Sequence, residues 1–143
     1  IALGIIPGGT GTQRLPRLLG RGRALEVILG GDDLDAETAE AWGYLNRALP
    51  ADEIGPFVDR LARRIASFPA PAIAAAKAAV DAAERPLAEG LAEEAYLFQT
   101  LLATEEAPRN MTRFLARGGQ TAAGELEVGT LAGTLGQGDD ALA

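Results

Sequence analysis

A glycine-rich stretch near the start of the chain, P-G-G-T-G-T-Q-R at residues 7–14, is the first place where the sequence could do chemistry. Glycine permits unusual backbone angles and lets a ligand approach the backbone closely. A turn that leads into a helix also presents unpaired N–H groups, which suit a polarised oxygen or a bound water. The residues alone therefore leave two interpretations open, a small binding site or an ordinary turn and helix start.

Two familiar glycine-rich motifs do not fit this stretch. A phosphate-binding loop needs a lysine and then a serine or threonine after the glycines, and Gln13 and Arg14 stand there instead. A dinucleotide-binding turn needs a third glycine and a strand–helix–acid arrangement, which the sequence does not offer. A nucleotide-phosphate site at the turn is therefore disfavoured.

Four arginines follow the turn, and the leucines between them supply an apolar side. This pattern predicts a solvated helix face, with an anion-binding site as the alternative. The arginines are Arg14, Arg17, Arg21 and Arg23.

Composition excludes several classes of function. The 143 residues include no cysteine and no histidine, which rules out disulfides, thiolate metal sites and serine–histidine triads. The net charge of −7 argues against nucleic acid as a partner. No apolar run approaches the roughly 20 residues of a membrane-spanning helix, and no signal-peptide pattern is visible. We expect no membrane partner and a cytoplasmic location.

The elements that would position these groups are mostly helices. Asp35 predicts an N-cap, and glycines at 30–31 and 43 predict helix ends. The alternating residues 44–49 predict a short strand at best. Beyond Pro56, apolar residues at helical spacing predict four more helices, which cover 57–68, 73–83, 87–102 and the region of 111–115.

The end of the chain has a different composition. Residues 118–143 hold four acidic residues, no basic residue, no aromatic residue and seven of the 18 glycines. Such a stretch buries too little apolar surface to offset its ordering entropy, so it predicts a flexible, acidic, glycine-rich tail. The alternative is weak docking of its few large apolar residues on a partner, namely Leu126, Val128, Leu131 and Leu135.

The stretch L-G-I-I-P-G-G-T-G-T-Q-R-L-P-R-L-L-G at residues 3–20 resembles the enoyl-CoA hydratase/isomerase family, the crotonases. Further stretches resemble later parts of that family in the same order, up to about Arg117. They are D-A-E-T-A-E-A-W-G-Y-L-N-R-A-L-P-A-D-E-I, P-A-P-A-I-A-A-A-K-A-A-V, E-G-L-A-E-E-A-Y-L-F-Q-T-L-L-A-T-E-E-A and M-T-R-F-L.

The resemblance implies a mainly α chain, the C-terminal helical part of a crotonase (ββα spiral) fold, with one or two short strands and without the β-spiral core. It divides the chain into the end of the crotonase core (1–50), a helical oligomerisation and CoA-contact region (51–117) and the tail (118–143). It also places a catalytic acidic residue just upstream of Ile1, so we expect no catalytic residue in the chain itself.

Five residues correspond to substrate-binding positions of the family. Gly8 matches the position whose backbone helps to hold the catalytic water, with Pro7 fixing the turn and Gly9 beside it. Phe114 and Arg117 correspond to closing-helix positions that contact the acyl-CoA. For Phe114 the alternative is core packing, and for Arg117 it is plain exposure.

The resemblance implies an acyl-CoA enzyme that hydrates 2-enoyl-CoA, or isomerises its double bond, through an oxyanion-stabilised thioester enolate. The CoA thioester is the substrate, and no cofactor or metal is implied. The expected assembly is a homo-oligomer, a trimer or a dimer of trimers, and the chain alone is expected to be inactive. The alternative function is a non-enzymatic helical oligomerisation module made as a short chain.

Overall fold

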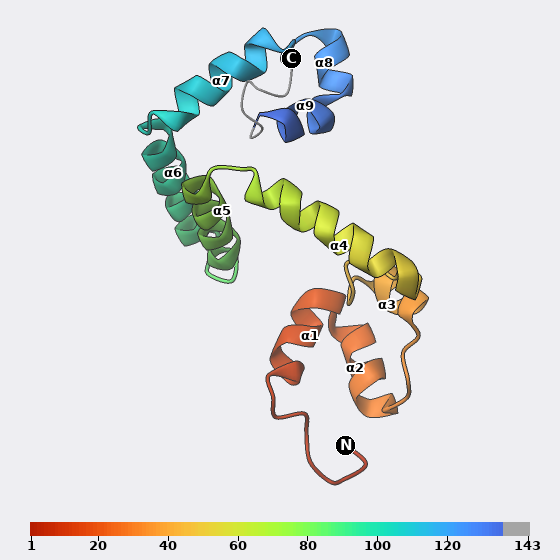
Figure 1. The fold of residues 1–143 in the computed structure, drawn as a ribbon. Helices are drawn as coiled ribbons and strands as arrows, with labels where there is room; N and C mark the ends of the chain where they lie inside the picture. The colour runs from red at the N-terminus through yellow and green to blue at the C-terminus, as the bar shows by residue number, and fades with distance from the viewer. Residues whose placement is uncertain (136–143) are drawn as a thin grey trace. The chain divides into compact units, whose positions relative to one another are not determined.

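The computed structural model describes residues 1–135, and these residues form nine helices and no strand (Figure 1). The chain divides into two compact units, Ile1–Gly55 and Pro56–Ala143. In chain order the helices are α1 (Gly11–Leu19), α2 (Arg21–Gly30), α3 (Ala36–Trp42), α4 (Ala51–Ala66), α5 (Ala70–Ala82), α6 (Leu87–Leu102), α7 (Glu106–Ala116), α8 (Ala122–Leu126) and α9 (Val128–Thr134). The prediction of a mainly α chain is confirmed.

Capping residues mark the ends of helices in the first unit. Gly31 follows the last residue of α2 and Gly43 that of α3, and both glycines have the positive φ angles (64° and 83°) that other residues disfavour. Asp35 caps α3, because its Oδ1 accepts a 2.8 Å hydrogen bond from the Thr38 N–H. The predicted cap and both glycine stops are therefore confirmed.

The short strand predicted at residues 44–49 does not form, and this part of the expectation is corrected. The N–H groups of Tyr44 and Leu45 both donate to the Ala39 carbonyl at the end of α3. The Ala48 N–H donates to Glu40 Oε2 at 2.8 Å. These groups are therefore already engaged with α3, and the described residues offer no partner strand.

The second unit holds the longer helices, and α5 and α6 pack side by side (Figure 1). Ala82 is only 1% exposed there. A Cβ added to Gly90 would lie 3.2 Å from the Ala82 carbonyl oxygen, so small residues permit this close approach. The helix predicted after Pro56 is present but begins earlier, at Ala51, with Pro56 inside it.

The predicted tail at 118–143 is helical in part. The hydroxyl of Thr121 accepts a 3.0 Å hydrogen bond from the Gly124 N–H and caps α8, and α9 follows at once. Residues 136–143 lie outside the described residues. Flexibility of this region stays a prediction.

Little apolar surface is buried. In the described part of the chain only four hydrophobic residues are buried, namely Leu19, Ala24, Ala39 and Ala82. Large apolar side chains lie exposed along most helices, such as Leu87 on α6 at 77%. None of the described helices is long and apolar enough to cross a membrane.

The cap of α3 predicts a pH dependence. The hydrogen bonds from Thr38, first from its backbone N–H, lower the pKa of Asp35 below its usual 3.8. The stabilisation is therefore complete above about pH 4 and is lost as the pH falls through the lower, folded-state pKa. Asp35→Asn keeps an acceptor oxygen but does not titrate.

Trp42 ends α3, so its fluorescence in urea titrations reports the unfolding of this region. We expect the original chain to lose stability relative to Asp35→Asn as the pH is lowered from 5 to 2. Parallel pH profiles of the two proteins would contradict the assigned role of the carboxylate.

Candidate functional site

The glycine stretch forms a turn that leads directly into α1. Thr10 is the residue before the helix, and its carbonyl oxygen accepts 3.0 Å hydrogen bonds from the N–H groups of Gln13 and Arg14. Its φ of 73° lies in the left-handed region, which a β-branched residue adopts only under strain. The unusual backbone angle therefore falls on Thr10, whereas Gly8 and Gly9 lack a positive φ.

A hollow of about 490 Å³ opens beside this turn in the first unit. This volume is in the range of small-molecule pockets. Pro7, Gly9 and Thr10 lie on its wall with side chains from α1, α2 and the turn after α3. Arg14 is the one charged residue among these lining residues. The remaining lining residues are Ile1, Gly11, Leu15, Leu18, Val27, Ile28, Gly31 and Tyr44.

The four arginines do not converge on one place. Arg14 lines the hollow, Arg17 donates a 2.6 Å hydrogen bond to the Gln13 carbonyl of its own helix, and the Arg23 guanidinium lies 5.3 Å from the centre of the Trp42 ring. The structure therefore leaves Arg14 alone of the four at the predicted turn site.

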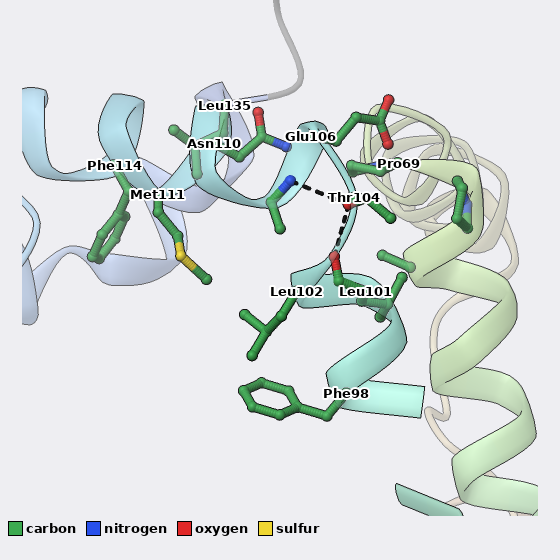
Figure 2. A pocket seen from close by; sticks show the side chains of 13 residues that line it. Pro69, Phe98, Leu101, Leu102, Thr104, Glu106, Asn110, Met111, Phe114 and Leu135 are labelled. Carbon is green, nitrogen blue, oxygen red and sulfur yellow. Dashed lines mark hydrogen bonds between the residues drawn. The ribbon is translucent and has the colours of Figure 1, made fainter. Parts of the chain in front are cut away.

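The second unit carries an apolar pocket of about 410 Å³ between α6, α7 and the start of α5. Figure 2 shows Phe98 and Leu102 of α6 facing the same space as Met111 of α7. Phe114 also lines it. The Thr104 hydroxyl, which donates to the Leu101 carbonyl at 2.7 Å and accepts from the Ala107 N–H at 3.4 Å, joins the two helices at its edge (Figure 2).

Phe114 and Arg117 have different surroundings. Gly119 lies so close to the Phe114 ring that any Cβ at position 119 would overlap it. Arg117 is half-buried and does not line the pocket; its Nη1 donates to the Thr134 carbonyl at 2.7 Å and to Thr134 Oγ1 at 3.0 Å. The five predicted site residues thus divide between the two units.

Acidic groups do not assemble into a metal site. Among residues 1–135, no three His, Cys, Asp or Glu side chains come together as metal ligands would. The arrangement offers backbone N–H groups, one arginine and apolar walls in the first unit, and an apolar pocket in the second. Those groups can bind and orient a partly apolar ligand, and neither pocket presents an acid–base pair.

Comparison with known proteins decides the family. The model of the family described as enoyl-CoA hydratase/isomerase matches residues 1–121. The chain belongs to the enoyl-CoA hydratase/isomerase family. A protein of Rhizobium meliloti (strain 1021) named probable enoyl-CoA hydratase is 43% identical over 118 residues, which is 82% of this chain and 46% of that protein.

Other relatives agree. The 2,3-dehydroadipyl-CoA hydratase of Escherichia coli (strain K12) is 36% identical over the same share of this chain and 46% of its own length. The crystal structure of an enoyl-CoA hydratase from Bacillus anthracis superposes with a TM-score of 0.76 at 32% identity, and covers 81% of this chain and 45% of that one. The chain thus spans about half the length of its relatives and matches the C-terminal part of the crotonase fold.

Sequence reasoning missed several residues of these hollows. Tyr44 and Ile28 line the first hollow because α2 and the turn after α3 fold back beside α1. Asn110 lines the second. The sequence singled out Pro7, Gly9 and Phe114, which line these hollows, and it named Leu135 only as a residue that could dock on a partner.

The strained Thr10 gives the first site prediction. Replacing Thr10 with asparagine, which tolerates the left-handed region, should stabilise the first unit by about 1 kcal/mol in urea unfolding. Thr12→Asn is the matched control, because Thr12 lies inside α1 and asparagine has a similar helix propensity. Equal stabilities of Thr10→Asn and the original chain would show that Thr10 carries no strain.

The close approach of Gly119 to Phe114 gives a second testable prediction. Gly119→Ala should destabilise the second unit by about 1–3 kcal/mol, because the new methyl group displaces the ring. Gly129→Ala is the control, since a Cβ on that glycine of α9 meets no other atom. A Gly119→Ala chain as stable as the control, measured by urea unfolding, would contradict the contact.

Proposed function

We propose that this chain is the C-terminal part of an acyl-CoA enzyme that adds water across the double bond of a 2-enoyl-CoA. The observation that carries the proposal is the family match over residues 1–121, with the glycine turn forming one wall of a hollow. In the reaction, the hydroxyl of water bonds to C3 and a proton is delivered to C2 through a thioester enolate. Donors to the enolate oxygen, each worth about 3–4 kcal/mol, come from the earlier part of the fold.

The glycine turn supports this reaction by positioning. We assign the Gly8 backbone to the catalytic water, with Pro7 fixing the turn and Gly9 leaving room beside it. The start of α1 immediately follows, where backbone N–H groups without helical partners favour a polar oxygen. The acidic groups that move protons are assigned to the part that precedes residue 1 in the relatives.

The second unit supports substrate binding. Phe114 lines an apolar pocket that suits part of an acyl-CoA, and Arg117 suits a CoA phosphate. The reaction needs no metal and no cofactor beyond the CoA thioester. Double-bond isomerisation is the neighbouring reaction, since it passes through the same enolate. We further propose a cytoplasmic homo-oligomer, a trimer or a dimer of trimers.

One observation favours a second candidate, a helical oligomerisation module without activity. Apolar residues along α4 and α6 are exposed, such as Val58, Leu61, Leu87 and Leu91, and surfaces of this kind favour association. Defined oligomers of the chain with no thioester binding would support this candidate over the enzyme.

Gly8 gives a direct test in the natural protein. A Cβ at Gly8 meets no other atom, so Gly8→Ala should fold normally. If its backbone positions the water, hydration of crotonyl-CoA should fall about 10- to 100-fold, mainly in kcat. Gly22→Ala, an equally open glycine in α2, should leave the rate unchanged. Unchanged activity of Gly8→Ala would remove Gly8 from the site.

Two simpler measurements separate the candidates. The 143-residue chain alone should hydrate crotonyl-CoA no faster than buffer does, and turnover by the pure chain would show that it carries its own catalytic acids. A natural gene product of about twice 14.8 kDa would support the enzyme, and one near 14.8 kDa would support the oligomerisation module.

A further inference from the structure

The segment 122–135, here called the C-terminal clasp, lies beyond the residues that the family model matches. It consists of α8 and α9 followed by Leu135 (Figure 1). It belongs to the second unit, where it accepts hydrogen bonds from Arg64 and Arg117 and where Leu135 lines the apolar pocket.

The first contact is with Arg117. Both hydrogen bonds of its Nη1 go to Thr134, at 2.7 Å to the carbonyl and 3.0 Å to Oγ1. The Thr134 hydroxyl donates its own proton to the Leu131 carbonyl at 2.8 Å, which leaves its lone pairs for the arginine. Thr134 is the last residue of α9, so the cation lies at the end of the helix where carbonyl groups are unpaired.

The second contact is with Arg64 of α4. Its Nη2 donates to the Gly129 carbonyl, in the first turn of α9. The same guanidinium lies so close to Gly133 that a Cβ there would meet it. At the end of the clasp, Leu135 lines the apolar pocket together with Met111 and Phe114.

Charge favours this arrangement. Arg117 is the last basic residue of the sequence, and every charged residue after it is acidic. Carbonyl groups of this acidic segment accept hydrogen bonds from two arginines, Arg64 of α4 and Arg117, which follows α7.

We propose that the C-terminal clasp withholds the Nη1 end of the Arg117 guanidinium from anionic ligands. Both protons of Nη1 are engaged with Thr134, so a phosphate that used them would have to displace α9. The apparent affinity of such a phosphate equals its intrinsic affinity multiplied by the fraction of molecules in which the clasp is open. The identity of the anion as a CoA phosphate rests on the proposed function, whereas the clasp itself does not.

The reactivity of Arg117 toward phenylglyoxal, followed by peptide mass spectrometry, tests the clasp without any CoA. We expect Arg117 to react about fivefold faster in a chain that ends at Thr121 and in full-length Leu135→Ser. Leu126→Ser is the matched control, because Leu126 lies in the same segment but is 88% exposed. Arg85, which lies outside the clasp, is the internal standard.

Equal reactivity of Arg117 in the original chain, Leu135→Ser and the shortened chain would overturn the proposal, provided that circular dichroism shows the helices intact. If Leu126→Ser and Leu135→Ser accelerated the reaction of Arg117 equally, the proposal would also be overturned. Leu135, which lines the pocket, would then contribute no more to closing the clasp than the exposed Leu126.

Calorimetric titration with coenzyme A separates this inference from the proposed function. Opening the clasp should tighten binding about fivefold, and Arg117→Ala should abolish the gain. If the opened and original chains bind coenzyme A with equal, measurable affinity, the proposal that the clasp withholds Arg117 is overturned. If Arg117 reacts faster with phenylglyoxal in the opened chains but no chain binds coenzyme A, the clasp is supported and the proposed role of Arg117 in CoA binding is contradicted.

Discussion

The shortage of internal apolar contact is the constraint on which the rest of this structure depends. Helices as short as α3, with seven residues, are marginal in water without packing. Among the described residues only α1 with α2 and α5 with α6 make extensive helix–helix contacts, and these pairs are neighbours in the chain. Caps and glycine stops therefore define the elements, and packing contributes at a few small residues such as Ala82.

This constraint also shapes both hollows. Apolar side chains that a full core would cover instead form half-open walls, such as Phe98 at 56% exposure. A pocket of this kind can hold a ligand, but neither of the two brings two acidic side chains together. The matched relatives are about twice as long as this chain.

The parts of the fold that the sequence predicts are those set by local interactions. The helix cap at Asp35 and the helix ends at Gly31 and Gly43 depend only on residues within one helical turn. A short window of sequence is therefore enough to predict them. The strand expected at 44–49 fails because its N–H groups turn back to Ala39 and Glu40, a competition that alternation of residue types does not reveal.

In the candidate site, too, the sequence predicts local features and does not predict contacts between separate elements. Apolar spacing predicts that Phe114 lies on a helix face, but its neighbour across the pocket, Phe98, comes from another helix. The strain at Thr10 was missed because glycines on both sides are the expected carriers of a positive φ. Arg117 could be read as exposed or as a phosphate ligand, and its contact with Thr134 is neither of these.

The glycines of the last segment show how composition can point in two directions. A glycine-rich acidic stretch predicts flexibility, because glycine loses most entropy on ordering. Yet Gly119 leaves room for the Phe114 ring, and Gly133 leaves room for the Arg64 guanidinium. The segment supplies few apolar side chains of its own, so its order depends on carbonyl groups that accept from the arginines of α4 and the end of α7. Each such hydrogen bond from a charged guanidinium contributes about 1.5–3 kcal/mol, so a few of them can order a segment that has little apolar surface to bury.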